Sequence, residues 1–243
     1  MMPHTVVSQA EWLVARKALL VKEKELTRLR DDLCRQRREL PWVKVEKEYV
    51  FEGPSGPESL AQLFGANDQL IVYHFMYAPG WNEGCPGCSF LSDHVDGANW
   101  HIPHGGATFT AISRAPYAEF APFKKRMGWK FHWVSSHGNS FNFDYNVSFT
   151  DESLALGTAY YNYEPLPEKK PGECPGVSVF FKDTDGAIYH TYSSYGRGPE
   201  ELIGAFMFLD LVPRGRNEAT IMDWVRFHDR YDTSPVETPC CAH

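Results

Sequence analysis

Residues 70–77 read Leu-Ile-Val-Tyr-His-Phe-Met-Tyr, a short apolar run of β-branched and aromatic side chains. A strand of this composition needs apolar cover on both faces, as strands in the middle of a sheet have. The chain then continues to Cys85-Pro86-Gly87-Cys88 and to a predicted helix over 88–95. We therefore predict a buried strand that delivers two closely spaced cysteines to the start of a helix.

Further segments extend this strand into an α/β sheet. Strands are predicted over 43–51, 107–113 and 129–134, and helices over 59–64, 116–127, 200–211 and 222–229. A hairpin is predicted from 177–182 and 187–192, because Asp183-Thr184-Asp185-Gly186 supplies its turn. Alternating strands and helices predict a central sheet covered on both faces, and the closing hairpin makes that sheet mixed.

The chain is predicted to have three parts. Residues 1–42 form a helical arm, residues 43–232 form the α/β domain with an irregular insertion near 136–170, and residues 233–243 form a loose tail. In the arm, Ser8 and Glu11 predict a capping box and Pro41 predicts the stop. A seven-residue stripe runs along this helix through Trp12, Leu19, Leu26, Leu33 and Leu40.

Two interpretations of that stripe stay open. The helix could pack along its own domain, or it could clasp a second copy and form a homodimer. A complete coiled-coil seam is not indicated, because the companion positions are only half apolar. These positions are Ala15, Lys22, Leu29 and Gln36.

The composition of the chain restricts its cellular compartment and the classes of partner that it can bind. The chain has 243 residues, 43% of them hydrophobic, so it can bury a core without disulfide bonds. No apolar run approaches the roughly 18 residues that a membrane helix needs, and Met1–Ala10 lacks the pattern of a secretory signal. We predict a cytoplasmic protein without a membrane partner. Its net charge of −7 argues against nucleic acid as a partner.

The closely spaced cysteines indicate redox chemistry. The start of a helix stabilises a thiolate at Cys85, and Pro86 fits the first helical turn without losing a hydrogen bond. Cys85 is predicted to attack a disulfide, and Cys88 is predicted to resolve the mixed disulfide. The other four cysteines, Cys34, Cys174, Cys240 and Cys241, are interpreted as passive, the last two as part of the tail.

A metal site is the first alternative, because a zinc ion would need about four ligands. His94, His101 and His104 follow the cysteines and could complete a set, but their spacing is not that of a regular zinc motif. Inert structural thiols are the second alternative. We predict neither a metal nor a cofactor.

Four further side chains are candidates for a supporting role near the cysteines. Trp81 could shield the thiolate, and Glu83 could move a proton of the buried thiol. Arg114 could hold an anionic substrate or pair with Glu119 or Asp144. His190 could line the cleft or serve as a hydrogen-bonded sheet residue.

Motifs along the whole chain resemble a bacterial thioredoxin-like family of unsettled function, whose members are described as predicted dithiol–disulfide oxidoreductases. The resemblance covers about Val7 to Tyr231 and includes the strand leading to Cys85-Pro86-Gly87-Cys88-Ser89. Its other motifs are Glu11-Trp12, Arg37-Arg38-Glu39-Leu40-Pro41-Trp42, Ser113-Arg114-Ala115-Pro116, Arg126-Met127-Gly128-Trp129, Trp133-Val134-Ser135-Ser136, Phe141-Asn142-Phe143-Asp144, Gly176-Val177-Ser178-Val179-Phe180, His190-Thr191-Tyr192-Ser193 and Arg197-Gly198.

The resemblance implies a thioredoxin-like, peroxiredoxin-like three-layer sandwich with a long N-terminal helix added. It assigns the redox role to Cys85 and Cys88. Thioredoxins carry a cis-proline opposite their cysteines, and either Pro175 or Val177 occupies the corresponding place here. The expected activity is thiol–disulfide exchange with a protein or small-molecule disulfide, and an external thiol restores the pair. A thiol peroxidase and a non-catalytic binding or redox-sensing protein are the alternatives.

Overall fold

In the computed structural model, which describes residues 4–166 and 172–231, strand β4 (Gln69–His74) is hydrogen-bonded along both edges. It runs parallel to β5 (Ala107–Ser113) and antiparallel to β9 (Gly176–Lys182). The register places Tyr73 opposite Ala111 on one side and Val177 on the other. The predicted buried strand is therefore the centre of the sheet.

The sheet has eight strands in a mixed arrangement. From one edge to the other they are β1 (Val43–Lys44), β10 (Ile188–Tyr195), β9, β4, β5, β6 (His132–Ser135), β2 (Val50–Gly53) and β3 (Gly56–Ser59). Strands β4, β5 and β6 are parallel, whereas β9 and β10 form the predicted antiparallel hairpin. A cysteine-bearing crossover between two parallel strands, with an antiparallel hairpin on their other side, is the thioredoxin-like arrangement.

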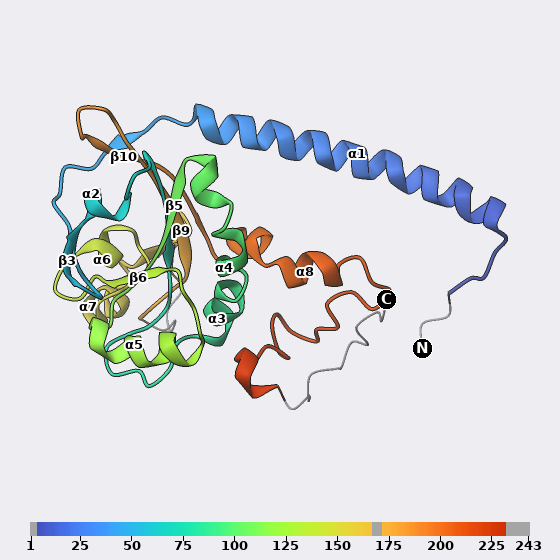
Figure 1. The fold of residues 1–243 in the computed structure, drawn as a ribbon. Helices are drawn as coiled ribbons and strands as arrows, with labels where there is room; N and C mark the ends of the chain where they lie inside the picture. Colours follow the sequence, from blue (N-terminus) through green and yellow to red (C-terminus); the bar gives the residue numbers. More distant parts are fainter. Residues whose placement is uncertain (1–3, 167–171, 232–243) are drawn as a thin grey trace, which may run out of the picture. The chain divides into compact units, whose positions relative to one another are not determined.

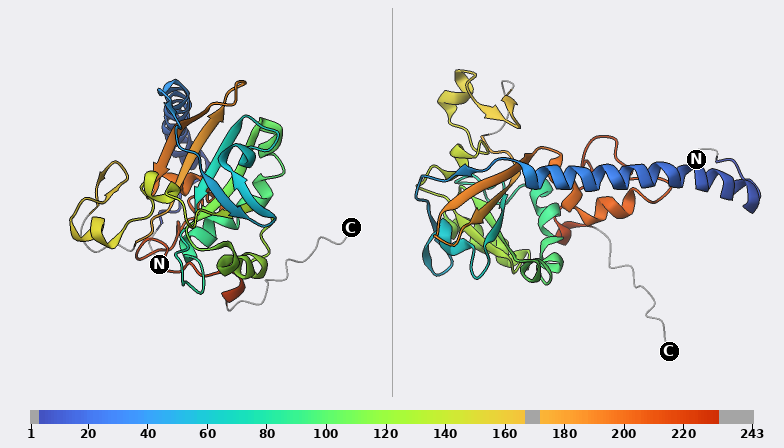
Figure 2. Two further views of the ribbon diagram at one scale, coloured as in Figure 1. Left: turned by 90° about the vertical axis from the view of Figure 1, so that its left-hand side faces the viewer. Right: turned by 90° about the horizontal axis from the view of Figure 1, so that it is seen from above.

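Helices cover both faces of this sheet, which confirms the three-layer prediction (Figures 1 and 2). One face carries α3 (Pro86–Ser92), α4 (Val95–Ala98), α5 (Tyr117–Arg126) and α8 (Gly204–Leu209). The other carries α2 (Leu60–Leu63) and α6 (Phe141–Asp144). Each face has its own aromatic core, with Trp133 stacked on Phe120 in the first and Phe51 against Phe141 in the second.

The expected single strand over 43–51 is wrong. Its two ends, β1 and β2, lie at opposite edges of the sheet, because Val43 pairs with His190 and Glu52 pairs with Ser135. Between them the chain crosses the sheet, and Tyr49 binds Asp144 through a 2.9 Å hydrogen bond. This long-range contact overrides the local alternation of side chains. The Gly53–Pro57 break is the turn of a hairpin that pairs β2 with β3.

The later segments are less regular than expected. The predicted helix over 200–211 is split at Ile203 into η2 (Gly198–Leu202) and α8. The predicted helix over 222–229 is replaced by turns and by η3 (His228–Arg230), and Met222 has a left-handed φ of +60° that a regular helix does not contain. In the described part of the segment predicted as an insertion, 136–166, the elements are short: α6, α7 (Asp151–Ala155), β7 (Tyr160–Tyr161) and β8 (Glu164–Pro165). Helix η1 (Ile102–Gly105) precedes β5.

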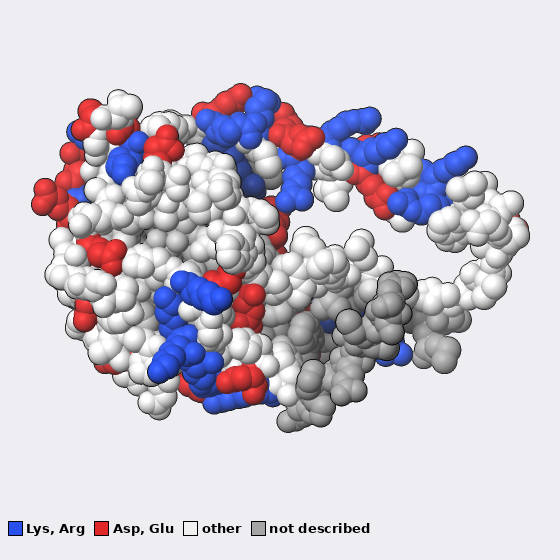
Figure 3. All heavy atoms as spheres, viewed as in Figure 1, with Lys and Arg blue, Asp and Glu red and all other residues white. Residues whose placement is uncertain are grey.

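Residues 1–41 form a unit separate from residues 42–243. Its helix α1 (Gln9–Glu39) confirms the long N-terminal helix, and Ser8 and Glu11 make the predicted capping box. No side chain of α1 is buried, and acidic and basic groups alternate along it (Figure 3). Dimerisation through its apolar stripe stays a prediction. None of the described helices is long and apolar enough to cross a membrane. The tail with Cys240 and Cys241 lies outside the described residues.

A chain of polar groups runs through the second core. His74 Nε2 lies 2.8 Å from Ser178 Oγ, which lies 2.8 Å from Ser193 Oγ, and Ser193 Oγ lies 2.7 Å from His190 Nε2. Burial and, to a smaller extent, the neighbouring His190 lower the pKa of His74 to about 3. Burial also lowers the pKa of His190. Both imidazoles are therefore held neutral inside the fold.

We expect acid to destabilise the protein through His74. A histidine in the unfolded chain titrates near pH 6.5, whereas the folded pKa is about 3. Between these values the unfolded state binds more protons, so the free energy of unfolding falls as the pH drops from 6.5 towards 3. At pH 5 the loss from this group is about 2 kcal/mol.

Urea unfolding at neutral pH and at pH 5 measures this loss. The stability advantage of the wild type over His74→Gln should shrink by about 2 kcal/mol at the lower pH. His137→Gln, at an exposed position, is the control and should show no such change. An advantage of the same size at both pH values would contradict the prediction.

Candidate functional site

Both cysteines form hydrogen bonds with Met76, which lies just beyond the end of β4. The Cys85 amide donates to the Met76 carbonyl at 3.2 Å, and the Met76 amide donates to Cys88 Sγ at 3.5 Å. Gly84 lies so close to Phe75 that a Cβ there would be 2.5 Å from the Phe75 ring. The loop can therefore lie against the end of β4 only with glycine at this position.

Helix α3 begins directly after Cys85. Cys85 is the N-cap residue, and Pro86 takes the first helical position, where its missing N–H costs nothing. The Ser89 hydroxyl donates to the Cys85 carbonyl at 3.0 Å, which ties the cap to the first turn. The structure thus places Cys85 and Pro86 where the sequence predicted them.

The two thiols differ sharply in their environment. Cys85 is partly exposed, whereas Cys88 is only 2% exposed, and both are free thiols. A hydrogen bond from the Cys88 thiol lowers the pKa of Cys85 to about 6, against the opposing effect of burial, and the amides of Cys88 and Gly87 contribute to this. Burial raises the pKa of Cys88 well above its ordinary value, and the neighbouring Cys85 raises it further. Cys85 is therefore the thiolate of the pair at neutral pH.

Tyr73 is a site residue that the sequence analysis missed. Its buried hydroxyl hydrogen-bonds to the Cys88 sulfur and lowers the pKa of that thiol against the effect of burial. Side chains alternate along β4, so Tyr73 faces α3 while His74 faces the opposite core. The only signal in the sequence was a hydroxyl-bearing residue in an apolar strand just ahead of the cysteines.

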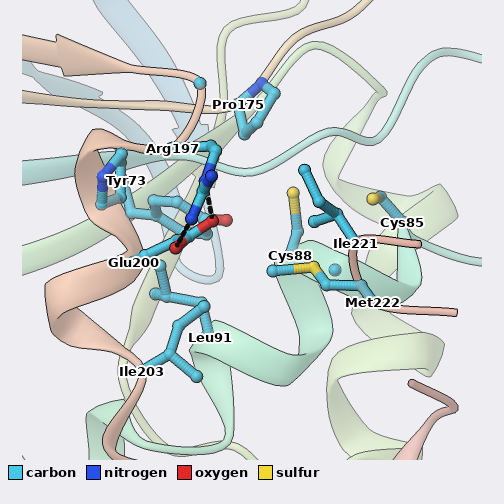
Figure 4. A pocket seen from close by; sticks show the side chains of 13 residues that line it. Tyr73, Cys85, Cys88, Leu91, Pro175, Arg197, Glu200, Ile203, Ile221 and Met222 are labelled. Atoms are coloured by element: carbon cyan, nitrogen blue, oxygen red, sulfur yellow. Dashed lines mark hydrogen bonds and ion pairs between the residues drawn. The ribbon is translucent and has the colours of Figure 1, made fainter. Parts of the chain in front are cut away.

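A cavity of about 210 Å³ adjoins both sulfurs (Figure 4). Its wall is almost entirely apolar. The side chains labelled in Figure 4 are Tyr73, Cys85, Cys88, Leu91, Pro175, Arg197, Glu200, Ile203, Ile221 and Met222. Arg197, which is 69% exposed, pairs with Glu200 at 2.8 Å, so the charges in the wall compensate each other.

Pro175, and not Val177, lines this cavity. Val177 is buried in β9 opposite Tyr73 of β4. Trp81 packs partly buried against the first core and is not among the lining residues. His190 lies on the other face of the sheet, at the end of the polar chain described above.

The two charged candidates form ion pairs away from the cavity. Glu83 pairs with Arg126 and Arg230, and the hydrogen bond from Arg126 is the largest cause of its lowered pKa. A carboxylate held in this way is a poor base for the buried thiol. Arg114 binds neither Glu119 nor Asp144. Its Nε lies 2.5 Å from Oε1 of Glu173, a buried carboxylate.

The histidines after the cysteines do not assemble with them. His94 Nδ1 lies 2.8 Å from the Phe90 carbonyl, and its Nε2 accepts from the Ala205 amide at 3.1 Å. Both ring nitrogens are therefore occupied within the chain. Among residues 4–166 and 172–231, no group of three or more His, Cys, Asp or Glu is arranged to hold a metal ion.

Comparison with known proteins gives a family match. A family described as "Bacterial protein of unknown function (DUF899)" matches residues 1–231, which confirms the resemblance seen in the sequence. No curated protein matches the chain.

Three solved structures illustrate the structural similarity. Peroxidoxin BcpB from Mycobacterium tuberculosis has a TM-score of 0.46 and 14% identity, over 68% of this chain and 94% of that one. Peroxiredoxin Q from Xanthomonas campestris has a TM-score of 0.43 and 15% identity, over 66% and 89%. A secreted M. tuberculosis disulfide oxidoreductase homologous to E. coli DsbE has a TM-score of 0.33 and 18% identity, over 64% and 92%. The fold assignment rests on the strand order and not on these scores.

Alkylation kinetics should report the acidic thiol. The rate at which iodoacetamide modifies Cys85 should rise with pH to a plateau, with its midpoint near pH 6. Cys88→Ala removes the main hydrogen-bond donor and should move this midpoint upward. Cys88→Ser keeps a hydroxyl donor and should move it less. Mass spectrometry of the Cys85 peptide separates this thiol from the other cysteines.

A wild-type midpoint near the ordinary thiol value of about 8.5 would contradict this account of Cys85. So would a midpoint that is the same in the wild type and in Cys88→Ala.

Proposed function

The chain belongs to the bacterial DUF899 family, whose function is unknown, and we propose that it is a thiol–disulfide oxidoreductase that uses Cys85 and Cys88. The observation that carries this proposal is the division of labour between the two thiols. The accessible sulfur has a pKa of about 6, and the buried sulfur beside it keeps its proton. This is the asymmetry that an attacking and a resolving cysteine require.

In the proposed reaction, the Cys85 thiolate attacks one sulfur of a substrate disulfide. A bond forms between Cys85 and that sulfur, the substrate bond breaks, and the other half leaves as a thiolate. Cys88 then attacks the Cys85 sulfur and releases the second half. Its proton passes to a leaving thiolate, and Tyr73 steadies the charge that develops on Cys88 through its hydroxyl. Two electrons move from the dithiol to the substrate, and an external thiol reductant restores the pair.

A thiol peroxidase is less well supported by the site. Peroxidases of this kind surround the thiolate with a Ser or Thr hydroxyl and an arginine. No Ser or Thr is among the residues that line the described cavity, and its one arginine, Arg197, pairs with Glu200. The lowered pKa of the accessible thiol supports thiol chemistry over a role in binding alone, although a redox sensor would use the same thiol.

Trapping experiments test the proposal. Cys88→Ser lacks the resolving sulfur, so disulfide substrates should accumulate on Cys85 as stable mixed disulfides. Cys85→Ser is the matched control and should trap nothing, since it lacks the attacking thiolate. Non-reducing electrophoresis and mass spectrometry of the Cys85 peptide measure the product.

The wild type should in addition reach a defined reduction potential against a dithiol buffer and form the Cys85–Cys88 disulfide. Equal trapping by Cys88→Ser and Cys85→Ser would refute the assigned roles. A wild-type protein that never forms the internal disulfide would exclude an oxidoreductase.

A further inference from the structure

One wall of the cavity comes from the last described part of the chain, here called the strap and comprising residues 216–231. Its first end is held by Arg216, which pairs with Glu200 at 3.0 Å and with Asp210 at 2.8 Å. At its other end, Asp229 pairs with Arg126 at 2.7 Å, and His228 Nδ1 lies 2.7 Å from Asp93 Oδ1. The strap is thus fixed on both sides of the cysteines.

The strap is also packed into the protein between these ends. Val225 and Phe227 are each 5% exposed and belong to the core on the α3 face. The Trp224 indole contacts Phe90 of α3, with a centroid separation of 5.6 Å. The strap therefore packs into the core of the domain, and the residues between its ends have defined positions.

Those residues include Ile221 and Met222, which lie beside both cysteines (Figure 4). A Cβ at Gly87 would be 3.2 Å from Met222 Sδ and 3.8 Å from Cys85 Sγ, so the methionine sulfur lies directly over the turn between the two thiols. Met222 has a φ of +60°, a left-handed backbone conformation that is unfavourable for a long side chain. This unfavourable backbone conformation places the Met222 side chain over the redox centre. Backbone strain that persists at such a site indicates a functional constraint.

The space left between strap and cysteines is small and apolar. An engineered apolar cavity of about 150 Å³ in another protein holds benzene, so about 210 Å³ has room for a compact organic group of a few more atoms. A folded protein's disulfide loop brings polypeptide on both sides of its sulfurs. That polypeptide would need the surface which Ile221 and Met222 occupy.

We propose that Ile221 and Met222 are specificity-determining residues that restrict this centre to small disulfides with compact, uncharged groups and exclude protein disulfides. The inference rests on the disulfide chemistry proposed above for Cys85 and Cys88. The reduced dithiol and a small disulfide R–S–S–R give the Cys85–Cys88 disulfide and two thiols R–SH. One R group occupies the cavity while its sulfur is bonded to Cys85.

Single-turnover oxidation of the reduced full-length protein tests this. Diethyl disulfide, glutathione disulfide and insulin are the probes, and the loss of alkylatable Cys85 is the readout. A leaving thiol of lower pKa leaves faster, so each rate is divided by the rate of the same probe with dithiothreitol, and the normalised rates report access. The normalised rate of the wild type should be higher with diethyl disulfide than with the other two. Met222→Ala should raise the rates with glutathione disulfide and insulin at least about tenfold relative to diethyl disulfide, the discrimination that a few side-chain atoms in a pocket supply.

Met207→Ala, on the partly exposed side of α8, is the matched control and should leave all rate ratios unchanged. A wild type whose normalised rate with insulin equals that with diethyl disulfide would overturn the inference while leaving the proposed function intact. So would a Met222→Ala variant with unchanged ratios. If no probe forms the Cys85–Cys88 disulfide in either protein, the proposed function fails and the inference with it.

A second measurement needs no strap variant and applies even if Met222→Ala fails to fold. In the reduced wild type, N-ethylmaleimide should modify Cys85 much faster than a maleimide on a long polyethylene glycol chain. The same two reagents, applied to the urea-unfolded protein, give the reference ratio. Equal ratios in the folded and unfolded protein would overturn the inference.

Discussion

The two-sided hydrogen bonding of β4 fixes the geometry on which the rest of the site depends. Because β5 and β9 hold this strand along both edges, Met76 just beyond its end has a defined position. The carbonyl and the amide of this one residue then bind the Cys85 backbone and the Cys88 sulfur. Because side chains alternate along β4, the Tyr73 hydroxyl is directed towards the Cys88 sulfur. The central strand therefore helps to position both cysteines through the backbone of Met76 and the hydroxyl of Tyr73.

The same alternation separates two polar systems by the thickness of the sheet. Tyr73 serves the cysteines on one face, and His74, one residue later, begins the Ser178–Ser193–His190 chain on the other. Burial disfavours the charged form of the titratable groups in both systems, but the outcome differs. On the cysteine face, hydrogen bonds offset burial and favour a charged sulfur. On the histidine face, no comparable charge partner is present among the described groups around His74, and the ring stays neutral.

Local sequence patterns were sufficient for the parts of the fold that local forces determine. The strand over 107–113 has the predicted bounds, and the helix with the cysteines begins at the proline that favours a first turn. The segment 43–51 shows where local patterns fail, because its alternation of apolar and polar side chains does not indicate that its ends pair with different strands. The ion pair of Glu83 near the site could not be predicted for the same reason, since its partner Arg230 is 147 residues away in sequence. The cavity wall depends on the same kind of distant contact, so Tyr73 and Met222 were not predicted.

Glu83 stands two residues before Cys85 and binds both Arg126 and Arg230. Arg126 binds Asp229 as well, so one cluster of charges joins the loop that carries the attacking thiol to the end of the strap. These groups are roughly one-third to one-half exposed, and dissolved ions weaken pairs of this kind. Electrolyte therefore weakens the contact that joins the Cys85 loop to the end of the strap.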